Sequence, residues 1–160
     1  MNKLLASALA GGAVLAAQLS GRRWSPAPDH PRTAAWYASL RKPGFTPPGP
    51  VFAVAWTSLD VLQAYAGTRL LTAPSGSRRN VALALWTANV LGIAGFTYVL
   101  FGRRRLDQAT EVTAGMLLTS LGAVGASSRV DARAAWAGVP LASWIGFATL
   151  LQEEVWRRNA

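Results

Sequence analysis

Hydrophobic positions along the chain gather into five long windows that contain almost no charged residues. Asp60 is the only charged residue inside any window. Each window approaches the roughly 20 residues that a helix needs to cross a ~30 Å hydrocarbon core, and lipid penalises an unpaired backbone. We therefore predict an all-α membrane protein, a single domain over 1–160 built as one bundle of five transmembrane helices. The predicted spans are about 4–21, 50–68, 81–102, 112–128 and 134–152.

One long polar connection, 22–50, separates the first two predicted helices. Four prolines between 43 and 50 predict that no regular helix forms before Val51. Long connections in small bundles often have a function, such as a lid over a cavity. The alternative is a belt of aromatic rings at headgroup depth, which is common in membrane proteins. The aromatic residues of the connection are Trp24, Trp36, Tyr37 and Phe45.

Charge and composition agree with a membrane protein. Only 14% of the residues are charged, against about a quarter in soluble domains. The net charge of +9 comes from cations in short segments between windows, where topology requires them, so we expect no nucleic-acid partner. Cysteine is absent and His30 is the only histidine, which argues against a disulfide or a zinc site. His30 could also ligate a haem iron, but the role of an ordinary loop histidine is favoured.

The cations also predict an orientation. If the spans alternate, six of the 16 Lys and Arg residues lie on the side of the N-terminus and ten on the side of the C-terminus. The positive-inside rule then places the C-terminus in the cytoplasm and the N-terminus outside. The first window follows Lys3 and could instead be a cleaved signal peptide. Its direct continuation through Arg22 into the connection favours a retained helix.

Two predicted helices carry polar side chains at membrane depth. In the second, Trp56, Asp60 and Gln63 follow one another at helical spacing and share a face. A carboxylate inside the membrane usually faces the bundle interior and marks a function. The alternative is a structural bond to a neighbouring helix. Asn89, in the third, either joins helices, for about 0.6–2 kcal/mol, or presents its amide to a central pocket.

Small residues recur at the spacing that lets helices approach closely. Ala88 and Gly92 lie four apart in the third predicted helix, as do Gly122 and Ala126 in the fourth. Such pairs favour either a homodimer, with the third helix as the preferred seam, or packing within one chain.

Three stretches resemble the TspO/MBR family, the tryptophan-rich sensory proteins and translocator proteins. The resemblance covers nearly the whole chain and implies the five-helix architecture of that family. The first stretch is carried by Trp36-Tyr37, Leu40, Lys42-Pro43, Pro47-Pro48, Phe52 and Trp56-Thr57. The second is carried by Leu83 to Trp86, Val99, Phe101-Gly102 and Arg104-Arg105. The third is carried by Val130-Asp131, Ala134, Pro140, Trp144, Phe147-Ala148, Leu151, Trp156 and Asn159.

The resemblance implies a pocket for porphyrin or haem as a ligand, with no obligatory cofactor and with the lipid bilayer as surroundings. Indole rings are suited to this role because flat macrocycles stack on them; simple bundle packing is the alternative. Arg41 and Lys42 could meet propionates at the pocket mouth, or serve only as topology signals. The predicted ligand-binding residues are Trp36, Trp56, Asp60, Gln63, Asn89, Phe96, Trp144, Phe147 and Ala148.

Three functions remain open at this point. The first is a tetrapyrrole-binding sensor, carrier or regulator. The second is a light- and oxygen-dependent porphyrin-degrading enzyme, with Trp56 and Trp144 as the reacting side chains. The third is a transporter that uses Asp60, a residue that departs from the usual tyrosine of the family. Glu153 stands where the cholesterol motif of animal members needs a tyrosine, so we expect no cholesterol site there.

Overall fold

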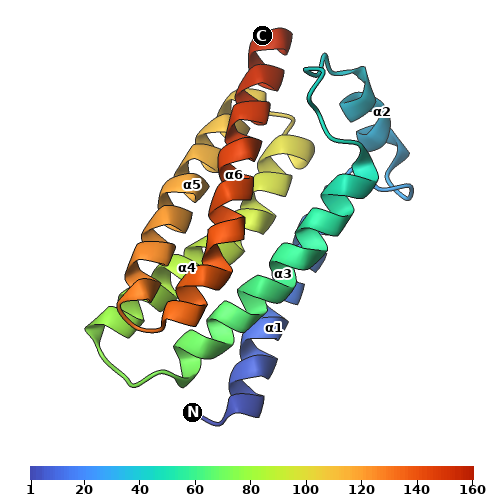
Figure 1. The fold of residues 1–160 in the computed structure, drawn as a ribbon. Helices are drawn as coiled ribbons and strands as arrows, with labels where there is room; N and C mark the ends of the chain where they lie inside the picture. The colour runs from blue at the N-terminus through green and yellow to red at the C-terminus, as the bar shows by residue number, and fades with distance from the viewer.

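The computed structural model describes all residues 1–160 and contains helices only (Figure 1). Five helices are long, one is short, and one π-helical segment, η1, continues α4. The elements are α1 (Lys3–Arg22), α2 (Pro31–Ser39), α3 (Gly49–Thr72), α4 (Ser77–Thr97), η1 (Tyr98–Gly102), α5 (Leu106–Ser128) and α6 (Ala132–Asn159).

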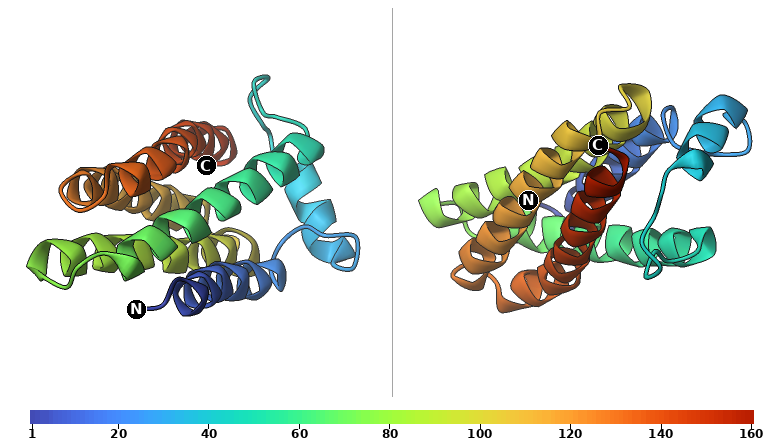
Figure 2. Two further views of the ribbon diagram at one scale, coloured as in Figure 1. Left: turned by 60° about the horizontal axis from the view of Figure 1, so that its bottom comes forward. Right: turned by 90° about the horizontal axis from the view of Figure 1, so that it is seen from above.

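The five long helices form one closed bundle. α1 packs against α3 and α4, α3 packs against α6, and α5 lies between α6 and α4. Figure 2 shows this arrangement from two further directions, with α2 and the connection beyond the end of α3. The N-terminus lies at one end of the bundle and the C-terminus at the other (Figure 1).

The connection between α1 and α3 differs from the expectation, because α2 is a regular helix before Val51. α2 starts at Pro31, and the first turn of a helix tolerates proline because its missing N–H is not needed there. The prolines from 43 to 50 interrupt the chain only after α2 has ended. Pro140 also lies within α6 without ending that helix.

Helix boundaries extend beyond the uncharged windows at most ends. α5 begins at Leu106 rather than 112, and α6 runs to Asn159 rather than 152. Charged residues are tolerated in a helix once it leaves the hydrocarbon, so the windows marked the apolar parts of longer helices. The third window is divided, because α4 ends at Thr97 and η1 follows.

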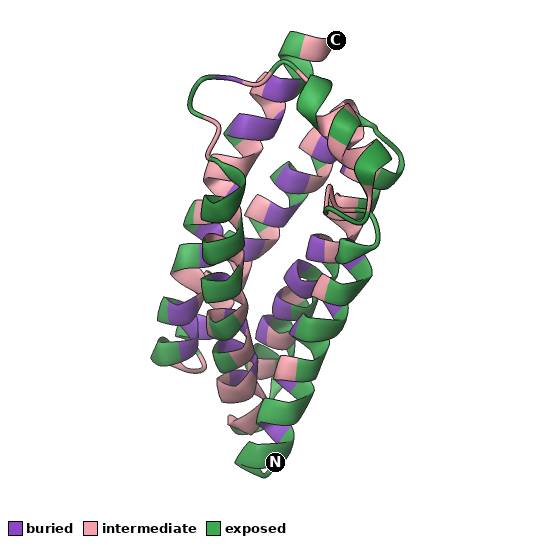
Figure 3. Ribbon diagram, turned by 90° about the vertical axis from the view of Figure 1, so that its right-hand side faces the viewer, coloured by how far each residue is buried: buried purple, intermediate pink, exposed green.

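Three helical segments are long and apolar enough to cross a membrane: Lys3–Arg22, Ser77–Gly102 and Ala132–Asn159. Buried residues lie on the inward faces of the helices, and exposed residues cover the outside (Figure 3). Large apolar side chains are among the exposed ones, for example Leu4 at 80% and Leu118 at 72%. A water-soluble monomer rarely exposes so much apolar surface, so the outside of the bundle suits lipid.

Candidate functional site

A groove opens on the outer surface of the bundle between α3 and α6. Its volume is about 430 Å³, within the 300–1,000 Å³ typical of small-molecule sites. Exposed Ser58, Pro140 and Ser143 form its rim, so it faces the surroundings of the bundle. The complete lining is Ala55, Ser58, Leu59, Leu62, Pro140, Ser143, Trp144 and Phe147.

Aromatic rings from three segments meet at this groove. Trp144 lies 5.6 Å from Phe52 and 5.5 Å from Phe147, measured between ring centroids. Phe45 of the connection reaches Phe147 edge-on, at 6.4 Å. The indole Nε1 of Trp144 is buried and has no hydrogen-bond partner. A buried indole N–H usually finds an acceptor, so an unpartnered one is unusual.

An ion pair joins the last turn of α3 to the N-cap residue of α6. Arg69 donates from Nη2 to Asp131 Oδ2 at 2.5 Å and from Nε at 3.0 Å. Asp131 Oδ1 also accepts from the backbone N–H of Ala134 and so caps α6. The hydrogen bond from Arg69 holds the pKa of Asp131 below its usual value. From this tie, the two helices diverge toward the end that carries α2 (Figure 1).

Beside the groove, an apolar layer crosses the interior. It is formed by Leu59, Ile93, Met116, Leu141 and Ile145, which come from four helices. Trp56, Phe96 and Trp144 pack against it. The structure thus brings these three predicted site residues onto one cluster, although only Trp144 lines the groove itself.

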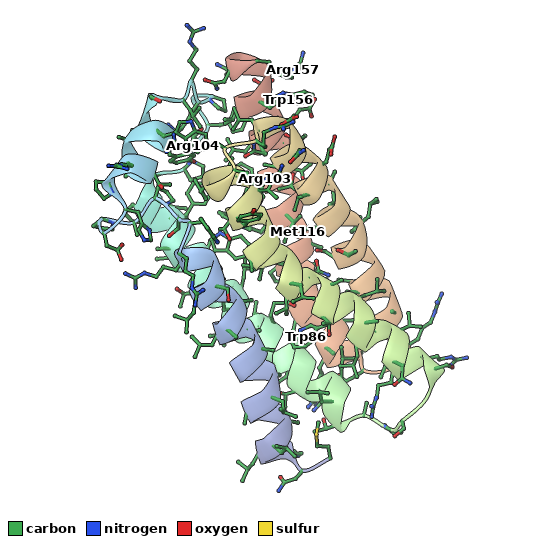
Figure 4. All side chains as sticks on the ribbon, turned by 180° about the vertical axis from the view of Figure 1, so that it is seen from behind. Trp86, Arg103, Arg104, Met116, Trp156 and Arg157 are labelled. Carbon is green, nitrogen blue, oxygen red and sulfur yellow. The ribbon has the colours of Figure 1, made fainter.

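On the other side of the apolar layer lies a small polar cavity of about 20 Å³. Asn89 borders it and joins α4 to α5, because its Oδ1 accepts from Ser120 Oγ at 2.7 Å. Trp86 Nε1 donates to the backbone oxygen of Gln63 at 3.0 Å and joins α4 to α3. Figure 4 shows Trp86 and Met116 on successive levels of the bundle. Gln63 and Asn89 therefore lie away from the groove, and Asn89 serves as an interhelical link.

Asp60 faces a different neighbour from the one its spacing suggested. Its Oδ1 accepts a hydrogen bond of 2.9 Å from Gln18 Nε2 of α1. Asp60 lines neither the groove nor the polar cavity. The carboxylate joins α1 to α3, which is the structural role considered for it above.

The connection packs on the end of α4 through aromatic contacts. Trp36 and Tyr37 of α2 both meet Phe101 of η1 edge-on, at 6.4 and 5.4 Å. Arg104 adopts a left-handed backbone conformation, with φ of 54°, and its guanidinium lies 5.4 Å from the Trp36 ring. Trp36 is thereby part of the docking surface for α2 and does not reach the groove.

Arg41 and Lys42 hold the connection in place. The backbone of Arg41 exchanges two hydrogen bonds of 3.0 Å with the Asn159 side chain at the end of α6. Lys42 Nζ donates to Ala38 O and Leu40 O and lies 4.5 Å from the Tyr37 ring centroid. Desolvation lowers the pKa of Lys42, and burial raises that of Tyr37. Only the Arg41 side chain remains exposed.

Two of these contacts escaped the sequence reasoning. Asn159 was noted only as part of the family resemblance, and its pairing with Arg41 spans 118 residues. No local pattern marked Gln18 as the partner of Asp60. Ala148, the last predicted site residue, is partly buried on α6 and lines neither cavity.

The small residues examined for helix pairing act within the chain. A Cβ on Gly92 would lie 2.8 Å from Met116 Cγ, and one on Gly122 would lie 3.5 Å from Leu85 Cδ1. Gly92 therefore allows α4 and α5 to approach closely, whereas a methyl group at Gly122 would make only an ordinary contact. The homodimer stays a prediction.

An all-helical bundle with apolar outer faces and three candidate spans is an integral membrane protein. A family model described as the TspO/MBR family matches residues 8–157, so the chain belongs to that family. Its relatives include a tryptophan-rich sensory protein of Cereibacter sphaeroides, which is 35% identical over 78% of this chain and 77% of its own length. The translocator protein of Homo sapiens is 31% identical over 81% of this chain and 78% of its own length. Protein CrtK of Rhodobacter capsulatus is 30% identical over 78% of this chain and 79% of its own length.

Proposed function

We propose that this protein binds a tetrapyrrole in the groove between α3 and α6, as a sensor, carrier or regulator. The observation that carries the proposal is the groove itself, in which the Trp144 and Phe147 rings stand beside one another in an apolar wall. Flat macrocycles stack on such rings. The names of the relatives, sensory protein and translocator protein, agree with a ligand-binding role.

The proposal includes five transmembrane helices with the C-terminus in the cytoplasm. α3 and α5 are not among the three segments identified above as long and apolar enough to cross a membrane, and they carry Asp60 and Glu111. Their outward positions are nevertheless apolar: Val54 and Val61 of α3 and Leu118 of α5 are each more than 60% exposed. These faces would be unfavourable in water and favourable in lipid.

A titration of protoporphyrin IX tests the binding site. The full chain in lipid nanodiscs is titrated, and the Soret absorbance of the porphyrin is followed so that tryptophan variants remain comparable. Trp144→Ala is expected to weaken binding about tenfold, since loss of a stacked ring costs about 1.4 kcal/mol. Trp136→Ala is the matched control, because Trp136 lies on the same helix and is 74% exposed. Equal affinities for the two variants would contradict the proposed site.

Illumination of the same complexes separates binding from catalysis. Stable absorbance under light supports a sensor, carrier or regulator, whereas oxygen-dependent loss of the Soret band would show porphyrin breakdown. Transport coupled to Asp60 stays a prediction, and the bond from Gln18 gives the carboxylate a sufficient structural role.

A further inference from the structure

The polar cavity between α3, α4, α5 and α6 is lined by apolar residues and by four polar side chains, those of Gln63, Asn89, Ser120 and Ser127. Gln63 is 4% exposed and Ser127 is 5% exposed. Neither side chain has a hydrogen-bond partner within the chain, and both border the cavity. A buried amide without a partner costs free energy, so such groups normally pair with a protein group or an ordered water.

The remaining polar lining is already partly used. Asn89 Oδ1 accepts from Ser120, and Asn89 Nδ2 donates one of its two hydrogens to Leu85 O. Ser120 Oγ lies within hydrogen-bond distance of both Asn89 Oδ1 and Met116 O, and its single hydrogen can serve only one of them. The Gln63 amide and the Ser127 hydroxyl are therefore free to form hydrogen bonds with an occupant of the cavity. One N–H of Asn89 is also free.

Size and charge define the occupant. A volume of about 20 Å³ suits one water molecule, which needs roughly 10–15 Å³ and two to four polar partners. No charged side chain lines the cavity, so a cation there would lack a counter-charge. The adjoining carboxylate, Asp131, is paired with Arg69.

We infer that the polar cavity is a binding site for a single internal water molecule held by Gln63 and the polar groups of α4 and α5. The water completes the hydrogen bonds of Gln63 and links α3 to the helices that Asn89 already joins. The apolar layer separates it from the groove, since Leu141 borders the cavity and Leu59 borders the groove.

Nuclear magnetic resonance of the full chain in nanodiscs tests this directly. Selective ¹⁵N labelling of glutamine gives four side-chain amides, from Gln18, Gln63, Gln108 and Gln152, and Gln63→Met identifies the signal of interest. We expect cross-relaxation between the Gln63 amide protons and water. Cross-relaxation and proton exchange give rotating-frame cross-peaks of opposite sign, so the two can be distinguished. Gln152 is the control within the same spectrum, because it is 6% exposed but donates to Leu106 O.

One outcome supports the inference and three would overturn it. A water cross-peak at Gln63 that is absent at Gln152 and lost in Ser127→Val, where the added methyl groups fill the cavity, supports the site. No cross-peak at Gln63 in the unsubstituted protein means a dry cavity and overturns the inference, as does a cross-peak that persists unchanged in Ser127→Val. A saturable shift of the Gln63 amide with NaCl but not with choline chloride would show a cation and would also overturn it.

Discussion

At the scale of single residues, Gly67 shows how closely the helices approach. A Cβ at this position would lie 2.5 Å from Trp86 Cζ2 and 2.9 Å from the Cβ of Ala10. Glycine is therefore required where α1, α3 and α4 meet, because any side chain would collide with a buried indole. The Trp86 ring is also fixed by its bond to Gln63 O, so it has little freedom to move aside.

Gly67→Ala is expected to destabilise the bundle by about 1–3 kcal/mol through overpacking. Thermal unfolding of the purified protein in one detergent measures the effect as a lower melting temperature. Gly115→Ala is the matched control, since a Cβ there has no atom within 4 Å. Alanine is the better helix former, so this control should be neutral or stabilised by up to about 1 kcal/mol. Equal stability of the two variants would contradict the close packing described.

At the scale of helices, the geometry of the groove follows from where α3 and α6 are tied. The Arg69–Asp131 pair holds them at one end, and Phe45 of the connection spans the other end by its contact with Phe147. The walls of the groove are thus set by one polar and one aromatic contact. The polar contact lies outside the residues that line the groove, whereas the aromatic contact includes Phe147 of the lining.

The Asp131 carboxylate makes the ion pair with Arg69 sensitive to acid. Its pKa in the folded protein is lowered by Arg69, so the ionised form is favoured by folding. That contribution is complete above the unfolded pKa of about 3.9 and is lost as the pH falls through the lower, folded pKa. Melting temperatures measured from pH 6 to pH 3 should therefore fall less steeply in Asp131→Asn than in the unsubstituted chain.

Asparagine is the chosen substitution because it can still cap α6 while removing the charge. Asp29→Asn is the control, since Asp29 forms a solvent-exposed pair with Arg22. If the melting temperature depends on pH in the same way for Asp131→Asn and the unsubstituted chain, the Arg69–Asp131 ion pair contributes nothing to acid sensitivity.

At the scale of the whole molecule, the cations are divided between the two ends of the bundle. The end that carries α2 and the C-terminus holds ten of them; Figure 4 shows Arg103, Arg104 and Arg157 there. The proposed orientation predicts that a reporter active only in the cytoplasm functions when fused after Ala160. The same reporter placed before Met1 should be inactive, and the reverse pattern would contradict the orientation.

The windows of apolar residues predicted the existence and order of the five long helices, because burial and lipid contact both require such windows. α2 escaped prediction because its nine residues contain no buried side chain and are only weakly hydrophobic on average. Its position depends on the contact between Tyr37 and Phe101 of η1 and on the hydrogen bond between Asn159 and Arg41. In both contacts the two residues are distant in sequence. Local pattern carries no information on such pairings.

The candidate site was predicted in part for a similar reason. Trp144 and Phe147 lie on the groove. Asp60 and Gln63, however, were predicted to share one helix face but contact different parts of the bundle. Residues three apart on a helix differ in direction by about 60°. That difference is enough to direct Asp60 to α1 and Gln63 to the polar cavity. Helical spacing alone does not say which neighbouring helix each side chain meets.

The rim of the groove has a consequence for how affinity should be expressed. Ser58, Pro140 and Ser143 face the surroundings of the bundle, and the apolar layer lies between the groove and the polar cavity. On the proposed function, a porphyrin enters sideways from the acyl chains rather than along the helix axes. Its effective concentration is then a mole fraction in lipid, fixed by its partition coefficient. Dissociation constants quoted per litre of buffer would rise in proportion to the lipid added, with no change in the protein.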